Sequence, residues 1–257
     1  MCGFTVRGLE IGGGNTRICV PVMPRTLGEF EEILGKLDVS EFDILEWRAD
    51  ALQGASLADY IEGLEKLRRG LGHHMPLLFT LRTSAEGGGY SGTADACASI
   101  IAQVAQSGVA DMVDIELSTG DENVRAVVDA AKAAGVKVIV SHHNFSGIYN
   151  PEEIADMYRR MFVLGADIAK IALMPKNVRE CMAVMDAAAG ESLCPPHRAL
   201  IMVGMGRHGV ASRIMAREIG SCITFGYTSA AGASAPGQIS ACDLREIMEI
   251  TKKYTVS

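Results

Sequence analysis

Paired cysteines are missing from this sequence. The seven cysteines are scattered and none is spaced as Cys-x-x-Cys, so neither a zinc site nor a disulfide framework is indicated. No apolar run approaches the roughly 20 residues of a membrane-spanning helix. The opening Met1-Cys2-Gly3-Phe4 also lacks the basic and apolar regions of a signal peptide. We therefore expect a cytoplasmic protein whose buried thiols stay reduced.

Positive charge is also scarce. The chain has 24 Lys and Arg against 31 Asp and Glu, a formal net charge of −7. The densest basic group, Lys66, Arg68 and Arg69, suits the solvated end of a helix. A nucleic-acid-binding role therefore has no electrostatic support. The 257 residues, 48% of them apolar, are enough to bury a substantial core.

What the sequence does contain is a repeated alternation of short apolar segments with amphipathic ones. The apolar segments predict parallel strands, and the amphipathic segments predict helices. We expect strands over 17–23, 42–48, 77–82, 112–117, 136–141, 168–173, 200–203 and 222–225. We expect helices over 27–37, 57–70, 94–107, 122–134, 151–164, 177–189, 210–219 and 241–252.

Eight strand–helix units joined by short loops predict a (β/α)8 TIM barrel within one domain, residues 1–257. A doubly wound open sheet is the alternative, but it usually has fewer units and a glycine-rich turn after its first strand. Here the glycines at 12–14 precede the first long strand and open no helix. Residues 1–16 read instead as a β-hairpin, which we expect to close the bottom of the barrel.

One lysine interrupts an apolar strand. Lys170 shares a strand face with Ile168, Ala172 and Met174, so an amine held there would lose hydration and become partly neutral. A neutral amine is a nucleophile toward a ketone or aldehyde. The alternative is a lysine that reaches solvent or pairs with Asp167 or another carboxylate.

Charged and titratable residues also stand at the ends of several consecutive strands, where barrel enzymes place their chemistry. These residues are Glu46, Arg48, Arg82, Glu86, Asp114, Glu116, His142, His143, Lys170 and Arg213. A structural salt bridge could explain any one of these residues, but their occurrence at several consecutive strand ends favours an active site. A metal site is disfavoured because neither His-x-His nor His-Glu-x-x-His spacing occurs.

A lysine imine needs a general base, and histidine suits neutral pH. His143 lies on the strand next to that of Lys170, whereas alternation places His142 on the opposite face. Alternation alone does not say which of the two faces looks inward. Glu86 would orient the His143 imidazole. The arginines at 48, 82 and 213 indicate an anionic substrate.

These residues resemble the type I 3-dehydroquinate dehydratases of the shikimate pathway, over nearly the whole chain. Segment 114–117 (Asp-Ile-Glu-Leu) and segment 138–144 (Val-Ile-Val-Ser-His-His-Asn) together look like that family's specific signature. Val203 and Asn144 are less typical, because methionine and aspartate are frequent there. The other similar motifs are Glu46-Trp47-Arg48-Ala49-Asp50, the Arg82 to Gly88 loop, Lys170 to Pro175 and Ser234 to Gln238.

The resemblance implies that Lys170 forms a Schiff base with the C3 ketone of 3-dehydroquinate. His143 would remove the C2 proton and protonate the departing C1 hydroxyl, while Glu86 holds His143. Arg213 would clamp the substrate carboxylate. The residues implied to bind hydroxyls and fix the ring are Glu46, Arg48, Arg82, Ser234 and Gln238, with Met205 and Phe225 packing against it.

The family also implies a homodimer without metal or organic cofactor, and loop 231–238 as a lid. The product would be 3-dehydroshikimate, on the route to aromatic amino acids. Asp114 and Glu116 receive no defined role and are placed only as groups that could support the residues in contact with the substrate. A class I aldolase-like barrel shares the lysine and is the alternative enzyme, and a non-catalytic binding barrel is the alternative of another class.

Overall fold

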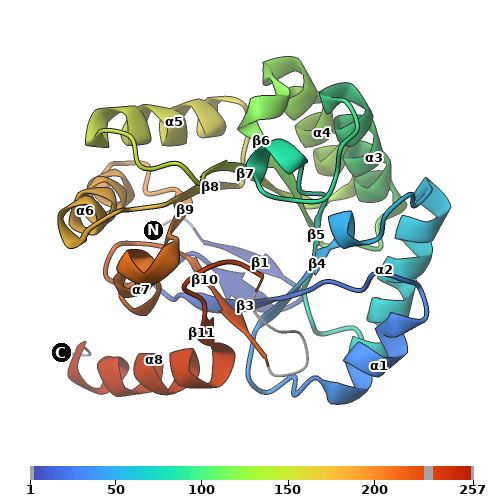
Figure 1. Ribbon diagram of the computed structural model, residues 1–257, viewed down its shortest axis with the longest axis horizontal. Coiled ribbons are helices and arrows are strands. Elements are labelled where there is room, and N and C mark those ends of the chain that lie inside the picture. The colour runs from blue at the N-terminus through green and yellow to red at the C-terminus, as the bar shows by residue number, and fades with distance from the viewer. Residues whose placement is uncertain (1–2, 229–233, 256–257) are drawn as a thin grey trace.

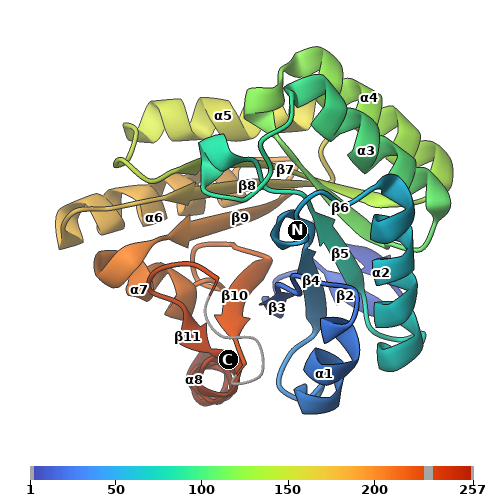
Figure 2. The same ribbon diagram turned by 45° about the vertical axis from the view of Figure 1, so that its right-hand side comes forward.

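Eight parallel strands ringed by helices form a barrel in the computed structural model, which describes residues 3–228 and 234–255 (Figure 1). Figures 1 and 2 show the helices outside the strands from two directions. The barrel strands are β3 (Arg17–Val22), β4 (Ile44–Arg48), β5 (Leu77–Thr80), β6 (Met112–Glu116), β7 (Lys137–Asn144), β8 (Ile168–Leu173), β9 (Ala199–Gly204) and β10 (Ile223–Tyr227). The helices are α1 (Glu29–Lys36), α2 (Leu57–Leu71), α3 (Ala94–Ser107), α4 (Asp121–Ala134), α5 (Pro151–Val163), α6 (Val178–Leu193), α7 (Gly206–Ile214) and α8 (Ala241–Thr255).

The strands pair in chain order from β3 to β9, and β10 pairs with β3. The ring closes between β9 and β10 through a single parallel bridge from Leu200 to Ser221. There the Cys222 amide donates to the Leu200 carbonyl at 2.8 Å. The predicted (β/α)8 barrel is therefore confirmed.

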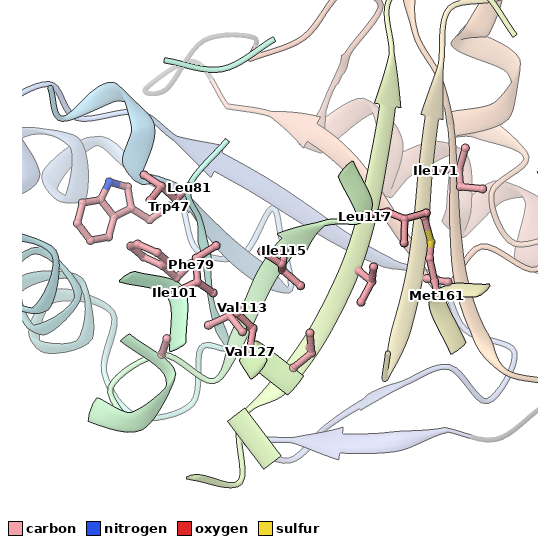
Figure 3. Packing of buried hydrophobic residues seen from close by; sticks show 14 of the residues in the cluster. Trp47, Phe79, Leu81, Ile101, Val113, Ile115, Leu117, Val127, Met161 and Ile171 are labelled. Atoms are coloured by element: carbon pink, nitrogen blue, oxygen red, sulfur yellow. The ribbon is translucent and has the colours of Figure 1, made fainter. Parts of the chain in front are cut away.

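The outer faces of the strands pack against the helices. Trp47 and Phe79, on neighbouring strands, are fully buried and meet edge to face with ring centroids 5.6 Å apart. Figure 3 shows these rings beside Ile101 of α3 and Val113 of β6. Strands that are buried on both faces need apolar residues at nearly every position, which is why they read as continuous apolar runs.

The inner faces form a second apolar cluster in the lower part of the barrel. Its members near the beginnings of the strands are Cys19, Ile44, Leu78, Met112, Ile139, Ile168, Ala199 and Ile223. The predicted N-terminal hairpin is confirmed as β1 (Phe4–Val6) and β2 (Leu9–Ile11), joined by Arg7 and Gly8, both with positive φ. Its Val6 and Ile11 belong to this inner cluster.

The bounds of β7 and α7 differ from the sequence prediction. β7 extends to Asn144 because His142 and His143 pair with Ile171 and Ala172 of β8, so the histidines are part of the strand. The helix expected at 210–219 is α7, which begins at Gly206 and ends at Ile214. Its first turn, Gly-Arg-His-Gly, has no apolar stripe, so periodicity did not reveal its start.

Three 3-10 helices, η1 (Ala49–Ala51), η2 (Ser84–Glu86) and η3 (Leu117–Thr119), follow β4, β5 and β6. A short strand, β11 (Ile239–Ser240), pairs with β10 and was not predicted. Among the described residues, every helix is too short or too polar to cross a membrane.

Candidate active site

A pocket with a volume of about 220 Å³ opens at the carboxyl ends of the strands, where barrel enzymes place their active sites. Asp114, Glu116 and His142, which also stand at strand ends, do not line it. It brings together all eleven residues to which the family resemblance gives a role. These are Glu46, Arg48, Arg82, Glu86, His143, Lys170, Met205, Arg213, Phe225, Ser234 and Gln238. Among the described residues, no group of three His, Cys, Asp or Glu side chains is placed to hold a metal ion.

His143 and Glu86 form a tightly held pair. The His143 Nδ1 atom lies 2.9 Å from Glu86 Oε2, and the His143 backbone amide donates to the same oxygen at 2.9 Å. The Ser118 hydroxyl donates to Oε1 at 2.6 Å. Because Glu86 accepts the Nδ1 proton, the tautomer that fits this network leaves Nε2 as the basic nitrogen.

The environment keeps His143 neutral. Burial, followed by the positive charge of Arg82, lowers its pKa from 6.5 to about 3, against the opposing effect of Glu86. Burial acts to raise the pKa of Glu86, but the hydrogen bonds from His142 and His143 outweigh it and lower that pKa. At neutral pH the pair is therefore a neutral imidazole held by a carboxylate.

His142 also reaches Glu86, which strand alternation did not indicate. Its Nδ1 lies 3.5 Å from Glu86 Oε1, and its Nε2 lies 3.0 Å from the Tyr149 hydroxyl. β7 ends there, and the carboxylate from η2 lies between the two rings. His142 therefore borders the pair from outside the pocket.

Lys170 is buried, with 5% of its surface exposed, and does not reach solvent. Its Nζ lies 3.5 Å from Asp114 Oδ2 and 4.3 Å from the centroid of the Phe225 ring. The other carboxylate considered from the sequence, Asp167, pairs with Lys137 at 2.8 Å. The amine thus faces the pocket between a carboxylate and an aromatic face.

Arg82 is held by the protein itself. Its Nη2 contacts Asp114 at 2.9 Å, and its Nη1 donates to Glu116 at 3.0 Å and to Ser141 at 2.9 Å. Burial acts against the charge, but the surrounding carboxylates raise the pKa of Arg82. Arg82 lines the pocket, but most of its hydrogen-bond donors are taken by these three side chains.

Arg213 is the opposite case. It is 2% exposed, and only Nη1 donates to a described partner, the Phe225 carbonyl at 3.0 Å. Its Nε and Nη2 atoms have no hydrogen-bond partner within the described residues. Burial lowers its pKa to about 10, which still leaves it charged at neutral pH. A buried guanidinium with two open donors suits a carboxylate ligand.

A family model for type I 3-dehydroquinase matches residues 18–255. The chain belongs to the type I 3-dehydroquinase family. The 3-dehydroquinate dehydratase of Klebsiella pneumoniae is 40% identical over 250 residues, covering 96% of this chain and 97% of that protein. The Bacillus licheniformis 3-dehydroquinate dehydratase is 36% identical over 245 residues, covering 95% and 96%.

A solved type I 3-dehydroquinate dehydratase has the same fold. The Clostridium difficile crystal structure, with covalently modified comenic acid, superposes with a TM-score of 0.93 at 33% identity. The superposition covers 98% of this chain and 99% of the Clostridium difficile chain.

Other contacts in this type I 3-dehydroquinase pocket could not be predicted from the strand pattern. Arg48 pairs through two nitrogens with Asp50 of η1, at 2.8 and 2.9 Å. Glu46 accepts from the Thr80 hydroxyl at 2.8 Å. Further pocket-lining residues that had no site role of their own in the sequence prediction are Gly87, Phe145, Ala172, Val203, Ala235 and Pro236, of which the last two lie in the predicted lid.

The predicted lid falls partly outside the structure: residues 231–233 lie outside the described residues. Its remaining part, 234–238, lines the pocket and is tied together by Gln238. The Gln238 Oε1 atom accepts from the Ser234 amide at 2.6 Å. The Pro236 carbonyl accepts from the Gly206 amide at 3.0 Å, which links the segment to α7.

Proposed function

We propose that this protein dehydrates 3-dehydroquinate to 3-dehydroshikimate through an imine on Lys170. The observation that carries the proposal is the convergence of a buried amine, a neutral imidazole and an open guanidinium on one pocket. Family membership supports the same substrate. The reaction belongs to the shikimate pathway, toward aromatic amino acids.

Arg213 binds the substrate carboxylate and thereby directs the ketone at C3 toward Lys170. Glu46, Arg48, Arg82, Ser234 and Gln238 bind hydroxyls and fix the ring, and Met205 and Phe225 pack against it. The Lys170 amine adds to the carbonyl carbon in its deprotonated form, and the carbonyl oxygen leaves as water after protonation. The result is an iminium, which withdraws electrons and acidifies the C2 proton.

His143 acts as the general base and then as the general acid. Its Nε2 removes the C2 proton, and the resulting enamine expels the C1 hydroxyl, which takes that proton and leaves as water. Glu86 holds the imidazole in the required tautomer. Water then hydrolyses the product iminium, so one water is lost overall and the lysine is regenerated.

We also propose that residues 1–257 act as one domain in a cytoplasmic homodimer. The family expectation supports the dimer, and the packing of Val6 and Ile11 among the inner strand residues supports hairpin closure of the barrel bottom. Light scattering in solution would give twice the 27.3 kDa chain mass.

Borohydride trapping tests the imine. With 3-dehydroquinate present, reduction should add the dehydrated, reduced substrate to Lys170, as identified by peptide mass, and the enone product should absorb in the ultraviolet. Lys170→Ala should abolish both signals while circular dichroism stays native. Lys137→Ala is the matched control, because Lys137 pairs with Asp167 away from the pocket. Turnover without any adduct on Lys170 would refute the imine.

A further inference from the structure

The search for an unassigned role leads to the carboxylate beneath Lys170. Asp114 stands on β6 and Lys170 on β8, with Ser141 of β7 between them. Asp114 is 2% exposed and lies 3.5 Å from Lys170 Nζ. Of the carboxylates in residues 3–228 and 234–255, it is the one within ion-pair distance of this amine.

The two oxygens of Asp114 are used differently. Oδ1 accepts from the Ser141 hydroxyl at 2.7 Å and contacts Arg82 Nη2 at 2.9 Å. Oδ2 is buried and has no hydrogen-bond partner among the described residues, and it faces Lys170. A buried carboxylate oxygen without a donor is costly, so its retention needs a reason.

We propose that Asp114 is the fixed counter-ion of the iminium formed on Lys170. This inference rests on the proposed function. An iminium nitrogen carries a positive charge and one N–H, and placing it in a buried site is costly unless an anion faces it. Oδ2 supplies the charge and the open acceptor, and the Phe225 ring faces the same nitrogen at 4.3 Å.

Arg82 and Ser141 fix Asp114 for this role. By holding Oδ1 they keep the carboxylate oriented and ionised, since burial alone would favour its protonated form. The charges of Arg82 and Lys170 outweigh burial and lower the pKa of Asp114 to about 2. Asp114 therefore stays charged through the pH range of turnover and stabilises the iminium more than the neutral imine.

Other groups around the amine do not supply this charge. Cys19 of β3 stays a neutral thiol because burial raises its pKa well above 9.0. Glu116 contacts Arg82 and Thr83 instead of Lys170. The remaining charged or titratable groups of the pocket are Glu46, Arg48, Arg82, Glu86, His143 and Arg213.

The pH profile of kcat tests the proposal. An opposite charge at this distance typically raises a cation's pKa by about one to three units. In Asp114→Asn, the fall of kcat on the basic side of the pH profile, its basic limb, should therefore occur at a pH lower by about one unit or more. Glu116→Gln is the matched control, because it removes an equally buried carboxylate from Arg82 without touching Lys170. Its basic limb should stay in place.

The outcomes separate the two proposals. An unmoved limb in Asp114→Asn, or an equal shift in Glu116→Gln, overturns the counter-ion role while imine chemistry stands. Absence of turnover and of adduct in the wild type overturns the proposed function. If Asp114→Asn does not fold, the wild-type enzyme incubated with product gives the answer. Its C=N infrared stretch should shift in D2O throughout the neutral range, and loss of that shift near neutrality overturns the role.

Discussion

In the proposed function, Arg213 trades stability of the free protein for binding of the substrate carboxylate. A buried guanidinium with two nitrogens that lack a partner among the described residues is costly to the free protein, because burial removes hydration from its charge. A bound carboxylate would supply both the charge and the acceptors. The site is therefore prepared for its ligand at the expense of the free protein's stability.

Arg213→Met should raise the thermal midpoint of the free protein and weaken substrate binding. An apolar side chain of similar length removes the unpaired charge, and each kcal/mol gained raises the midpoint by about 2–4 °C at this chain length. Loss of the carboxylate partner should lower kcat/KM by about a hundredfold or more. Differential scanning calorimetry and steady-state kinetics measure the two effects.

Arg68→Met is the contrasting control. Arg68 is partly buried, with 12% of its side chain exposed, and its guanidinium is paired with Asp111 at 2.5 Å and donates to the Met75 carbonyl at 2.7 Å, so that only its Nε lacks a hydrogen-bond partner among the described residues. Its removal should lower the midpoint and leave KM unchanged. A lower midpoint in Arg213→Met, or an unaltered kcat/KM, would contradict the carboxylate clamp.

At the scale of elements, the position of Arg213 depends on how closely α7 approaches β9. Gly209 of α7 packs against the backbone of Gly204, so that a Cβ on Gly209 would overlap the Gly204 carbonyl. The Ser212 hydroxyl accepts from the Gly204 amide at 2.7 Å and donates to the Gly209 carbonyl at 2.8 Å. Arg213 follows directly, so the helix and its guanidinium move together.

Gly209→Ala should therefore lower stability by about 1–3 kcal/mol and raise KM by displacing Arg213. Gly190→Ala is the matched control, since Gly190 lies within α6 and a Cβ there meets nothing within 4 Å. That change should instead raise stability by about 0.5–1 kcal/mol with KM unaltered. Urea unfolding and kinetics of both variants decide the matter; equal effects would exclude the close approach as the cause.

The elements were predictable to different degrees, for physical reasons. Strands buried on both faces and amphipathic helices leave strong patterns, so the barrel and its strand ends followed from the sequence, and with them the charged residues at those ends. Met205, Phe225, Ser234 and Gln238 were named only through the family resemblance. Side-chain partners at those ends did not follow. Asp50 belongs to a 3-10 turn and reaches Arg48, and His142 reaches Glu86 where the strand ends. The two-residue alternation of side chains along a strand predicts neither of these contacts.

Over the whole molecule, the two ends of the barrel contain different kinds of residues. The lower interior is apolar and is joined by Ile11 of the hairpin, which is fully buried. The upper interior contains Glu86, Asp114, His143 and Lys170, ionisable groups that are largely removed from water. The upper end should therefore make the folding free energy sensitive to pH.

The direction of that sensitivity follows from the pKa of His143. Its pKa falls from 6.5 to about 3 on folding, so between those values the unfolded chain binds a proton that the folded protein does not. Stability therefore rises with pH through this window and is lost as pH falls below about 6.5. The lowered pKa values of Glu86 and Asp114 act in the same direction at lower pH, whereas the raised pKa of Glu116 opposes them.

His143→Gln should remove the loss of stability that begins below about pH 6.5. Glutamine can still donate to Glu86 but does not titrate, so wild-type stability should fall relative to the variant by about 1.4 kcal/mol per pH unit below about 6.5. Above that pH the difference should be constant. His74→Gln is the control, because His74 is exposed and its substitution should leave the wild-type curve unchanged. Urea unfolding from pH 8 to 4 gives the free energy of unfolding of all three proteins. If the wild-type and His143→Gln curves of this free energy against pH are parallel, His143 is not held neutral by folding.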